Sequence, residues 1–203
     1  MPIKSCTLFV IVLLFSFQGH AQIEKGAIYF GARGGYLSIE DYAPRTYGGL
    51  ELDVMVTDKI GIHYSILFGE EYFHMPLAPV GGFFVAAAVS DIEEGVGFGL
   101  LLGALTAIIP EGVSYNIPLG ENSGFAPYIS PLQFEYLPSG EGNTYPGGAI
   151  GLRYHQYVGK KLFRVSPMVE YKVHYNKNPH PGISAGLNIA LQLKEKSAKL
   201  AVE

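Results

Sequence analysis

Charge, sulfur and tryptophan are all scarce in this sequence. Only 16% of its 203 residues are charged, and it has one cysteine and no tryptophan. So little charge beside 48% hydrophobic residues excludes an intrinsically disordered chain, which combines low hydrophobicity with high charge. The formal net charge of −4 provides no basic surface, so we expect no nucleic-acid partner. Glycine (26) and proline (13) are abundant, which disfavours a helical bundle because both weaken helix interiors.

Residues 1–21 have the three parts of a secretory signal peptide. Lys4 supplies the positive charge, residues 7–17 form the apolar run, and small residues occupy the −3 and −1 positions of a cleavage site after Ala21. An uncleaved membrane anchor is the alternative, but a spanning helix needs about 20 apolar residues. Cleavage would remove Cys6, so we expect a mature chain without disulfides or thiol chemistry.

The rest of the chain alternates between apolar and polar residues with a period of two. In the clearest stretch, residues 60–68, every second residue is Ile, Tyr or Phe. This period indicates β-strands, and several stretches reach the about 9–11 residues that cross a membrane as a tilted strand. The other alternating stretches are residues 27–37, 50–56, 113–117, 128–136, 150–158, 163–174 and 183–193. Tyrosines near their ends would form the aromatic girdle of a membrane barrel: Tyr115, Tyr128, Tyr136, Tyr157 and Tyr175.

The connections between these stretches alternate in length. Short turns are expected at residues 57–59, 119–124 and 159–160, and mostly longer connections at residues 39–46, 70–111, 138–146 and 176–181. Outer-membrane barrels have short periplasmic turns and longer extracellular loops, and lipid tolerates no open sheet edge. We therefore predict an all-β fold, an antiparallel up-and-down transmembrane β-barrel over residues 22–193. Eight strands fit best, with ten as the alternative, and a charged tail follows at residues 194–203.

An exported chain with Ala21-Gln22 at its cleavage site and Gly- and Tyr-rich alternating strands resembles the small outer-membrane β-barrel proteins of Bacteroidota-type bacteria. The resemblance covers most of residues 22–193 and is one of pattern, without a motif that singles out one member. It implies a location in the bacterial outer membrane. Such barrels often end on an aromatic residue, whereas the charged tail follows the last strand here. A periplasmic or secreted sandwich or lipocalin-like barrel is the alternative, but it should carry its charges outside.

The strand faces expected to point inward carry four cations and four carboxylates. An eight-strand interior is just wide enough for side chains to fill it, and buried charges must be paired. We therefore expect a closed, ion-paired lumen, with a small polar conduit, a narrow small-solute channel or a ligand site as alternatives. Neighbouring strands should bring Arg153 or Arg164 into contact with Glu135, Glu170 or Glu51. The expected lumen residues are Arg33, Glu51, Asp53, Glu135, Arg153, Arg164, Glu170 and Lys172.

Residues 70–111 are too apolar for an ordinary outer loop. Two apolar runs, residues 83–89 and 96–109, flank an acidic patch at residues 91–94. A free loop of this composition would expose a large apolar surface, so we expect an ordered insertion at the extracellular end. Residues 96–109 are predicted to be partly helical, and an extra strand pair is the alternative. The candidate partners of residues 80–109 are lipopolysaccharide or a partner protein.

His63 and Ser65, separated by one tyrosine, resemble the His-x-Ser element of outer-membrane lipid A deacylases, in which His activates a Ser nucleophile. Those enzymes place the element late in the chain, where residues 174–176 of this sequence are His-Tyr-Asn and lack the nucleophile. No histidine pair has metal-ligand spacing with a third ligand nearby. We therefore expect a monomeric structural or interaction protein that contacts outer-membrane lipid and has no cofactor, metal or catalytic residues. A lipid A deacylase-like barrel enzyme acting through His63 and Ser65 is the alternative.

Overall fold

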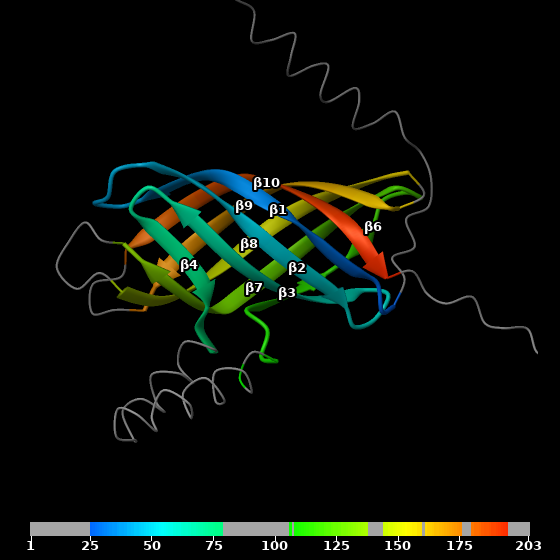
Figure 1. Cartoon of the computed structure of the whole chain (residues 1–203), viewed down its shortest axis with the longest axis horizontal. Helices are drawn as coiled ribbons and strands as arrows, with labels where there is room; N and C mark the ends of the chain where they lie inside the picture. Colours follow the sequence, from blue (N-terminus) through cyan, green and yellow to red (C-terminus); the bar gives the residue numbers. More distant parts are fainter. Residues whose placement is uncertain are drawn as a thin grey trace, which may run out of the picture.

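The strands form one closed antiparallel barrel (Figure 1). The computed structural model describes residues 25–78, 106, 108–137, 144–159, 161–175 and 180–194. The strands within these residues are β1 (Ile28–Ile39), β2 (Arg45–Met55), β3 (Ile60–Gly69), β4 (Tyr72–Pro76), β5 (Gly112–Tyr115), β6 (Ile117–Pro118), β7 (Ser123–Tyr136), β8 (Thr144–Val158), β9 (Phe163–His174) and β10 (Pro181–Lys194). No helix among the described residues is long and apolar enough to span a membrane.

Closure follows from the pairing of the first and last strands. β1 pairs with β2 on one side and with β10 on the other, and consecutive strands pair around the rest of the wall. The position between β3 and β7 is shared by three short strands. β4 and β5 each pair with both neighbours, and β6 continues along β7. The described strands therefore fill eight wall positions, which confirms the predicted eight-stranded barrel.

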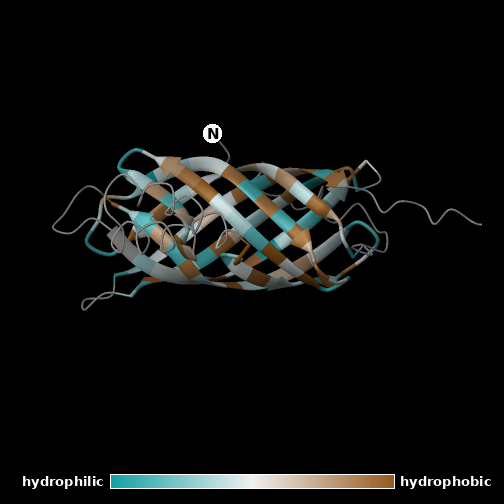
Figure 2. Cartoon of the chain, turned by 60° about the horizontal axis from the view of Figure 1, so that its bottom comes forward, coloured by the Kyte–Doolittle hydropathy of each residue, from teal (hydrophilic) through white to brown (hydrophobic). Residues whose placement is uncertain are grey.

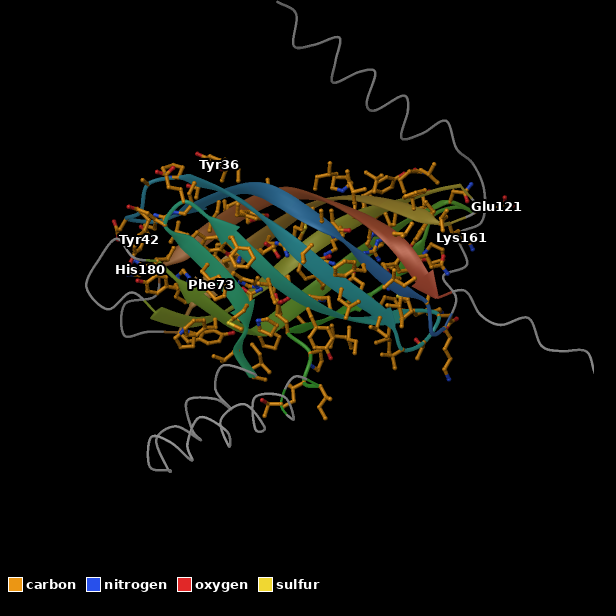
Figure 3. All side chains as sticks on the ribbon, in the orientation of Figure 1. Tyr36, Tyr42, Phe73, Glu121, Lys161 and His180 are labelled. Atoms are coloured by element: carbon orange, nitrogen blue, oxygen red, sulfur yellow. The ribbon has the colours of Figure 1, made fainter. Side chains whose placement is uncertain are left out.

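The two ends of the barrel differ in their connections. The turn end carries the start of β1, the end of β10 and the connections of residues 56–59, 119–122 and 159–162. The loop end carries the connections of residues 40–44, 70–71, 137–143 and 175–180. Figure 3 labels Glu121 and Lys161 at the turn end, and Tyr42 and His180 at the loop end. Connection lengths alternate as predicted, except that β3 and β4 are joined by only two residues.

The outward face of the wall is apolar and the inward face is polar. Ile66, Ile129 and Ile189 are exposed on the outside, whereas the charged side chains of the central strands are buried inside. Figure 2 shows the resulting alternation of hydrophobic and hydrophilic residues along the strands. An apolar outer face with a polar interior is the pattern of a barrel that crosses lipid, and a soluble barrel would reverse it.

β7 departs from strict alternation. Its pairing with β8 shifts between Ser130 and Gln133, which marks a β-bulge. An extra residue exchanges the inward and outward faces on its two sides. Tyr128 therefore lies inside the barrel, and Tyr157 lies inside because it shares the inward face of β8 with Arg153. The prediction that Tyr128 and Tyr157 belong to an outer girdle is wrong, while the other three predicted members are exposed: Tyr115, Tyr136 and Tyr175.

The wall strand between β3 and β7 is interrupted, so residues 70–111 do not form one insertion at the loop end. A two-residue turn joins β3 to β4, and Glu71 adopts a left-handed conformation there with φ of 53°. β4 ends at Pro76, which has no N–H to extend the ladder, and β5 begins at Gly112. The chain thus leaves the wall after Pro76 at a point between the loop end and the turn end of the barrel. The signal peptide, the helix predicted in residues 96–109 and the charged tail lie largely or wholly outside the described residues.

Candidate functional site

The interior of the barrel is layered. An apolar cluster fills it near the turn end: Ala27, Tyr29, Met55, Tyr157 and Ala190. A second apolar cluster fills it near the loop end: Leu37, Ile39, Tyr47, Leu67, Tyr72 and Leu137. The charged side chains lie between these two layers on the inward faces of the strands. This charged middle layer holds most of the titratable groups buried in the described residues, and it is the candidate functional site.

The part of the charged layer nearer the turn end is an arginine cluster. Arg153 of β8 donates from Nη1 to Glu51 Oε1 of β2 at 2.7 Å and to Asp53 Oδ1 at 3.2 Å. Arg164 of β9 also donates to Asp53. Arg33 of β1 donates to Glu51 at 3.3 Å and to Glu170 of β9. All of these pairs except Arg33–Glu51 join strands that are not neighbours in the sheet, so the cluster ties separate parts of the wall together. Its members are Arg33, Glu51, Asp53, Arg153, Arg164 and Glu170.

Two inward tyrosines cover the arginine cluster. The guanidinium carbon of Arg153 lies 4.4 Å from the ring centroid of Tyr128, and that of Arg164 lies 4.5 Å from the ring centroid of Tyr29. A cation over an aromatic face is attracted by the ring quadrupole, more strongly where water is excluded. Tyr128 is thus placed by the bulge in β7 to pack on an ion pair instead of meeting lipid.

The part of the charged layer nearer the loop end is a glutamate cluster around Glu135 of β7. Its carboxylate accepts from Lys172, from the Tyr72 hydroxyl at 2.8 Å and from His74 Nδ1 at 3.2 Å. Its second oxygen lies 2.6 Å from His174 Nε2. Partners from β4 and β9 therefore converge on one carboxylate that is 1% exposed, and its removal would leave Lys172 buried without its partner.

Ser65 of β3 lies beside the interruption of the wall and contacts two polar side chains. Its hydroxyl donates to Glu111 Oε2 at 2.8 Å and lies 3.0 Å from His74 Nε2. His74 also faces Glu111 Oε1 through Nε2 and Glu135 Oε1 through Nδ1, both at 3.2 Å. A carboxylate at each ring nitrogen places His74 to carry a proton on both nitrogens. In that form His74 cannot accept the hydroxyl proton of Ser65.

His63, the histidine expected beside Ser65 in an enzyme, has a different partner. It faces the lumen, as its parity predicts, and its Nε2 lies 2.6 Å from Ser130 Oγ of β7. Its Nδ1 has no hydrogen-bond partner in the described part of the chain. The structure thus brings Ser65 to His74 of the next strand instead, an arrangement that spacing along the sequence does not reveal.

All eight side chains expected in the lumen are buried in the interior. Glu111 joins them without having been predicted, so the buried described residues include five carboxylates and, with Arg45, five arginine and lysine side chains. Alternation assigns Glu111 to the wrong face. It lies two and four positions before Val113 and Tyr115, which face outward, but it precedes β5 at the interruption and is buried. Its one sequence signal is an acidic residue at the end of an apolar run.

The described residues contain no group of three or more His, Cys, Asp or Glu side chains that could hold a metal ion. The carboxylates of both clusters are instead engaged by arginine, lysine and histidine. Chemically, the charged layer is arranged to hold strands together across the lumen.

No protein-family model matches the sequence, and no curated protein sequence does either. Among solved structures, the N-terminal β-barrel domain of Pseudomonas aeruginosa OprF is 8% identical, with 83% of this chain and 100% of that chain covered and a TM-score of 0.50. A de novo designed transmembrane β-barrel is 12% identical, with coverages of 85% and 99% and a TM-score of 0.45. Ail, the attachment invasion locus protein of Yersinia pestis, is 10% identical, with coverages of 83% and 99% and a TM-score of 0.40. The likeness to the OprF domain concerns the fold alone: this chain has the closed eight-stranded antiparallel β-barrel.

Proposed function

We propose that this protein is a small bacterial outer-membrane β-barrel with a closed lumen, and that it acts as a structural or interaction protein. The apolar outer face and the closed wall support a position in lipid, where every backbone polar group must be paired within the protein. The signal-like residues 1–21 support export. The proposal includes a Bacteroidota-type source and a monomer, with lipopolysaccharide or a partner protein as candidates for contact through residues 80–109.

The filled interior is the observation that carries this proposal. The charged layer is cross-linked by ion pairs such as Arg153–Glu51 at 2.7 Å, and an apolar cluster lies on each side of it. Ion-conducting pores are lined by rings of one sign of charge or by backbone carbonyls, whereas here cations and carboxylates neutralise one another in contact. A solute crossing this barrel would have to break several buried ion pairs and displace two apolar layers.

Fractionation and conductance measurements test the proposal. We expect the protein to co-fractionate with outer membranes and to migrate on gels at different positions when boiled and unboiled. In planar bilayers, the folded protein should produce no stepwise current above that of a boiled sample, which is the control. Recovery as a soluble periplasmic protein would contradict the location, and reproducible conductance steps from the folded protein alone would contradict the closed lumen.

A lipid-modifying hydrolase is a second candidate, which one observation favours. Ser65, His74 and Glu135 follow one another at hydrogen-bond distance, as nucleophile, base and orienting acid do in serine hydrolases. Against it, Ser65 is 1% exposed and its hydroxyl donates to Glu111.

Mass spectrometry of lipid A from cells that express the wild type, Ser65→Ala or the control Ser114→Ala separates the two functions. We expect identical acylation in all three strains. Loss of an acyl chain that depends on Ser65 alone would establish the hydrolase.

A further inference from the structure

Two buried histidines contact the two oxygens of the Glu135 carboxylate. His74 is the cross-strand partner of Glu135 in the pairing of β4 with β7, and its Nδ1 lies 3.2 Å from Oε1. His174 reaches Oε2 from β9, with its Nε2 at 2.6 Å. Gly147 of β8 lies opposite His174, and a Cβ there would meet the His174 ring at 3.4 Å and the carbonyl oxygen of Val173 at 2.8 Å. A residue without a side chain at this position therefore leaves room for the ring.

Each ring nitrogen of these two histidines faces an acceptor. His174 Nδ1 lies 3.1 Å from the backbone carbonyl oxygen of His180, which can only accept, and its Nε2 faces the carboxylate. His74 Nε2 faces Glu111 Oε1 at 3.2 Å, and the neighbouring Ser65 hydroxyl donates its own proton to Glu111. A neutral imidazole carries one N–H, whereas the imidazolium carries two. The hydrogen bonds of both rings are therefore complete only when each ring holds a second proton.

Hydrogen bonds from the wall fix Glu111 in front of His74. Its Oε2 accepts from the backbone N–H of Ser65 at 2.8 Å, and its Oε1 accepts from Gln133 Nε2 at 3.0 Å. Its own N–H donates to the carbonyl oxygen of His63 at 3.1 Å. The carboxylate thus bridges β3 and β7 at the interruption. Each N–H of a doubly protonated His74 then points at a carboxylate that the wall holds in place.

The charges around the two rings favour the added protons. Glu111 and Glu135 lie at hydrogen-bond distance from the rings, whereas the ammonium of Lys172 contacts Glu135. Two carboxylates therefore attract the added protons, against one nearby ammonium. Further titratable and charged groups interact with this site from the neighbouring strands: His63 of β3, Tyr72 of β4, Glu170 of β9 and Arg33 of β1.

The site is close to water at the loop end and closed towards the turn end. His180, whose carbonyl oxygen accepts from His174, has a side chain that is 21% exposed, and its Nδ1 lies 3.5 Å from the exposed Asp41. Figure 3 labels His180 at the loop end. Towards the turn end, the arginine cluster comes next, and guanidinium groups do not release their protons in proteins. Protons that reach the site from the loop end therefore go no further.

We propose that the glutamate cluster is a proton-binding site that takes up two protons from the solution at the loop end, one on His74 and one on His174. The bound protons join β4, β7 and β9 through Glu135. Loss of either proton leaves a ring nitrogen facing an oxygen with no hydrogen between them, which costs the barrel a buried hydrogen bond. The inference rests on the proposed function only in that the loop end would then face the outside of the cell.

Such a site makes the barrel easier to unfold as the pH rises, because the folded state then binds more protons than the unfolded chain. Above about pH 6.5 the histidines of the unfolded chain are neutral. Each histidine that still holds its second proton in the barrel then raises the unfolding equilibrium constant about tenfold per pH unit, and two raise it about a hundredfold. A histidine that is neutral in both states contributes nothing in this range.

Urea titrations of the barrel in detergent micelles, between about pH 6.5 and 8.5, test this dependence. The test variants are His74→Gln and His174→Gln. The control is His155→Gln, since His155 is equally buried but its Nδ1 contacts the Ser166 hydroxyl at 2.8 Å instead of a carboxylate. We expect the wild type and the control to share the steep dependence on pH, and each test variant to lose about a factor of ten per pH unit from it.

Nitrogen NMR of the wild type with labelled histidine rings tests the site without any variant. The two nitrogens of an imidazolium have similar chemical shifts, whereas those of a neutral ring are far apart. At about pH 8 an exposed histidine is neutral, so we expect two imidazolium rings, those of His74 and His174. Fewer than two, or a stability of the wild type that does not fall with rising pH, would overturn the inference. Neither result depends on the outer-membrane location, which the fractionation experiment tests separately.

Discussion

Glu135 is the residue whose loss should most disturb the barrel without changing its shape. Glu135→Gln keeps the size of the side chain and removes its charge. Lys172, which is 2% exposed, then loses its carboxylate, and the remaining polar contact of its ammonium is the Tyr72 hydroxyl at 3.3 Å. His74 and His174 each lose the same ionised acceptor.

The expected cost follows from leaving a buried charge unpaired. Removing one partner of a buried pair typically lowers the free energy of unfolding by about 3–5 kcal/mol. The same change at Glu40, which is exposed in the loop-end connection, should alter stability by no more than about 0.5 kcal/mol. Glu135→Gln combined with Lys172→Met removes both charges, so the double variant should recover most of the stability that the single variant loses.

Urea titrations of protein folded in lipid vesicles measure these differences. The chain has no tryptophan, so unfolding is followed by far-UV circular dichroism and by the fraction of unboiled protein that keeps the folded gel mobility. A midpoint for Glu135→Gln equal to that of Glu40→Gln would refute the buried ion pair. A double variant less stable than Glu135→Gln alone would show that Lys172 is stabilised by other groups.

Three further predictions concern the interruption and the signal peptide. Glu111→Ala should lower the free energy of unfolding by about 1–3 kcal/mol, since the Ser65 N–H and the Gln133 amide lose their acceptor. The same change at the exposed Glu40 should not lower it, and equal urea midpoints for the two variants would contradict the bridging role. Deletion of residues 79–108 should leave a barrel with heat-modifiable mobility, because β4 and β5 already share one wall position, and failure to assemble would show that the segment is needed for folding. N-terminal sequencing of the exported protein should begin at Gln22, and an uncleaved N-terminus would favour the anchor.

Much of the charged layer could be predicted from the sequence because strand alternation is local. Ile60, Ile62 and Tyr64 alternate with small and polar residues whether or not the partner strands are known. In a narrow barrel surrounded by lipid, the polar face of each strand must then point into the interior. The prediction of the eight lumen residues required only this alternation and the assumption of a closed barrel.

Only the tertiary structure decided which side chains meet. Arg33 and Glu170 are separated by 137 residues and come together because closure sets β1 two positions from β9. The bulge in β7 turned Tyr128 inward, and a bulge depends on the pairing with the neighbouring strand rather than on local composition. Strand alternation could not predict that Glu111 points inward, because this residue precedes a strand that begins in the middle of the wall. Alternation along a strand reports which face a residue occupies, but register, closure and interruption are set between strands, where the ion pairs of this barrel form.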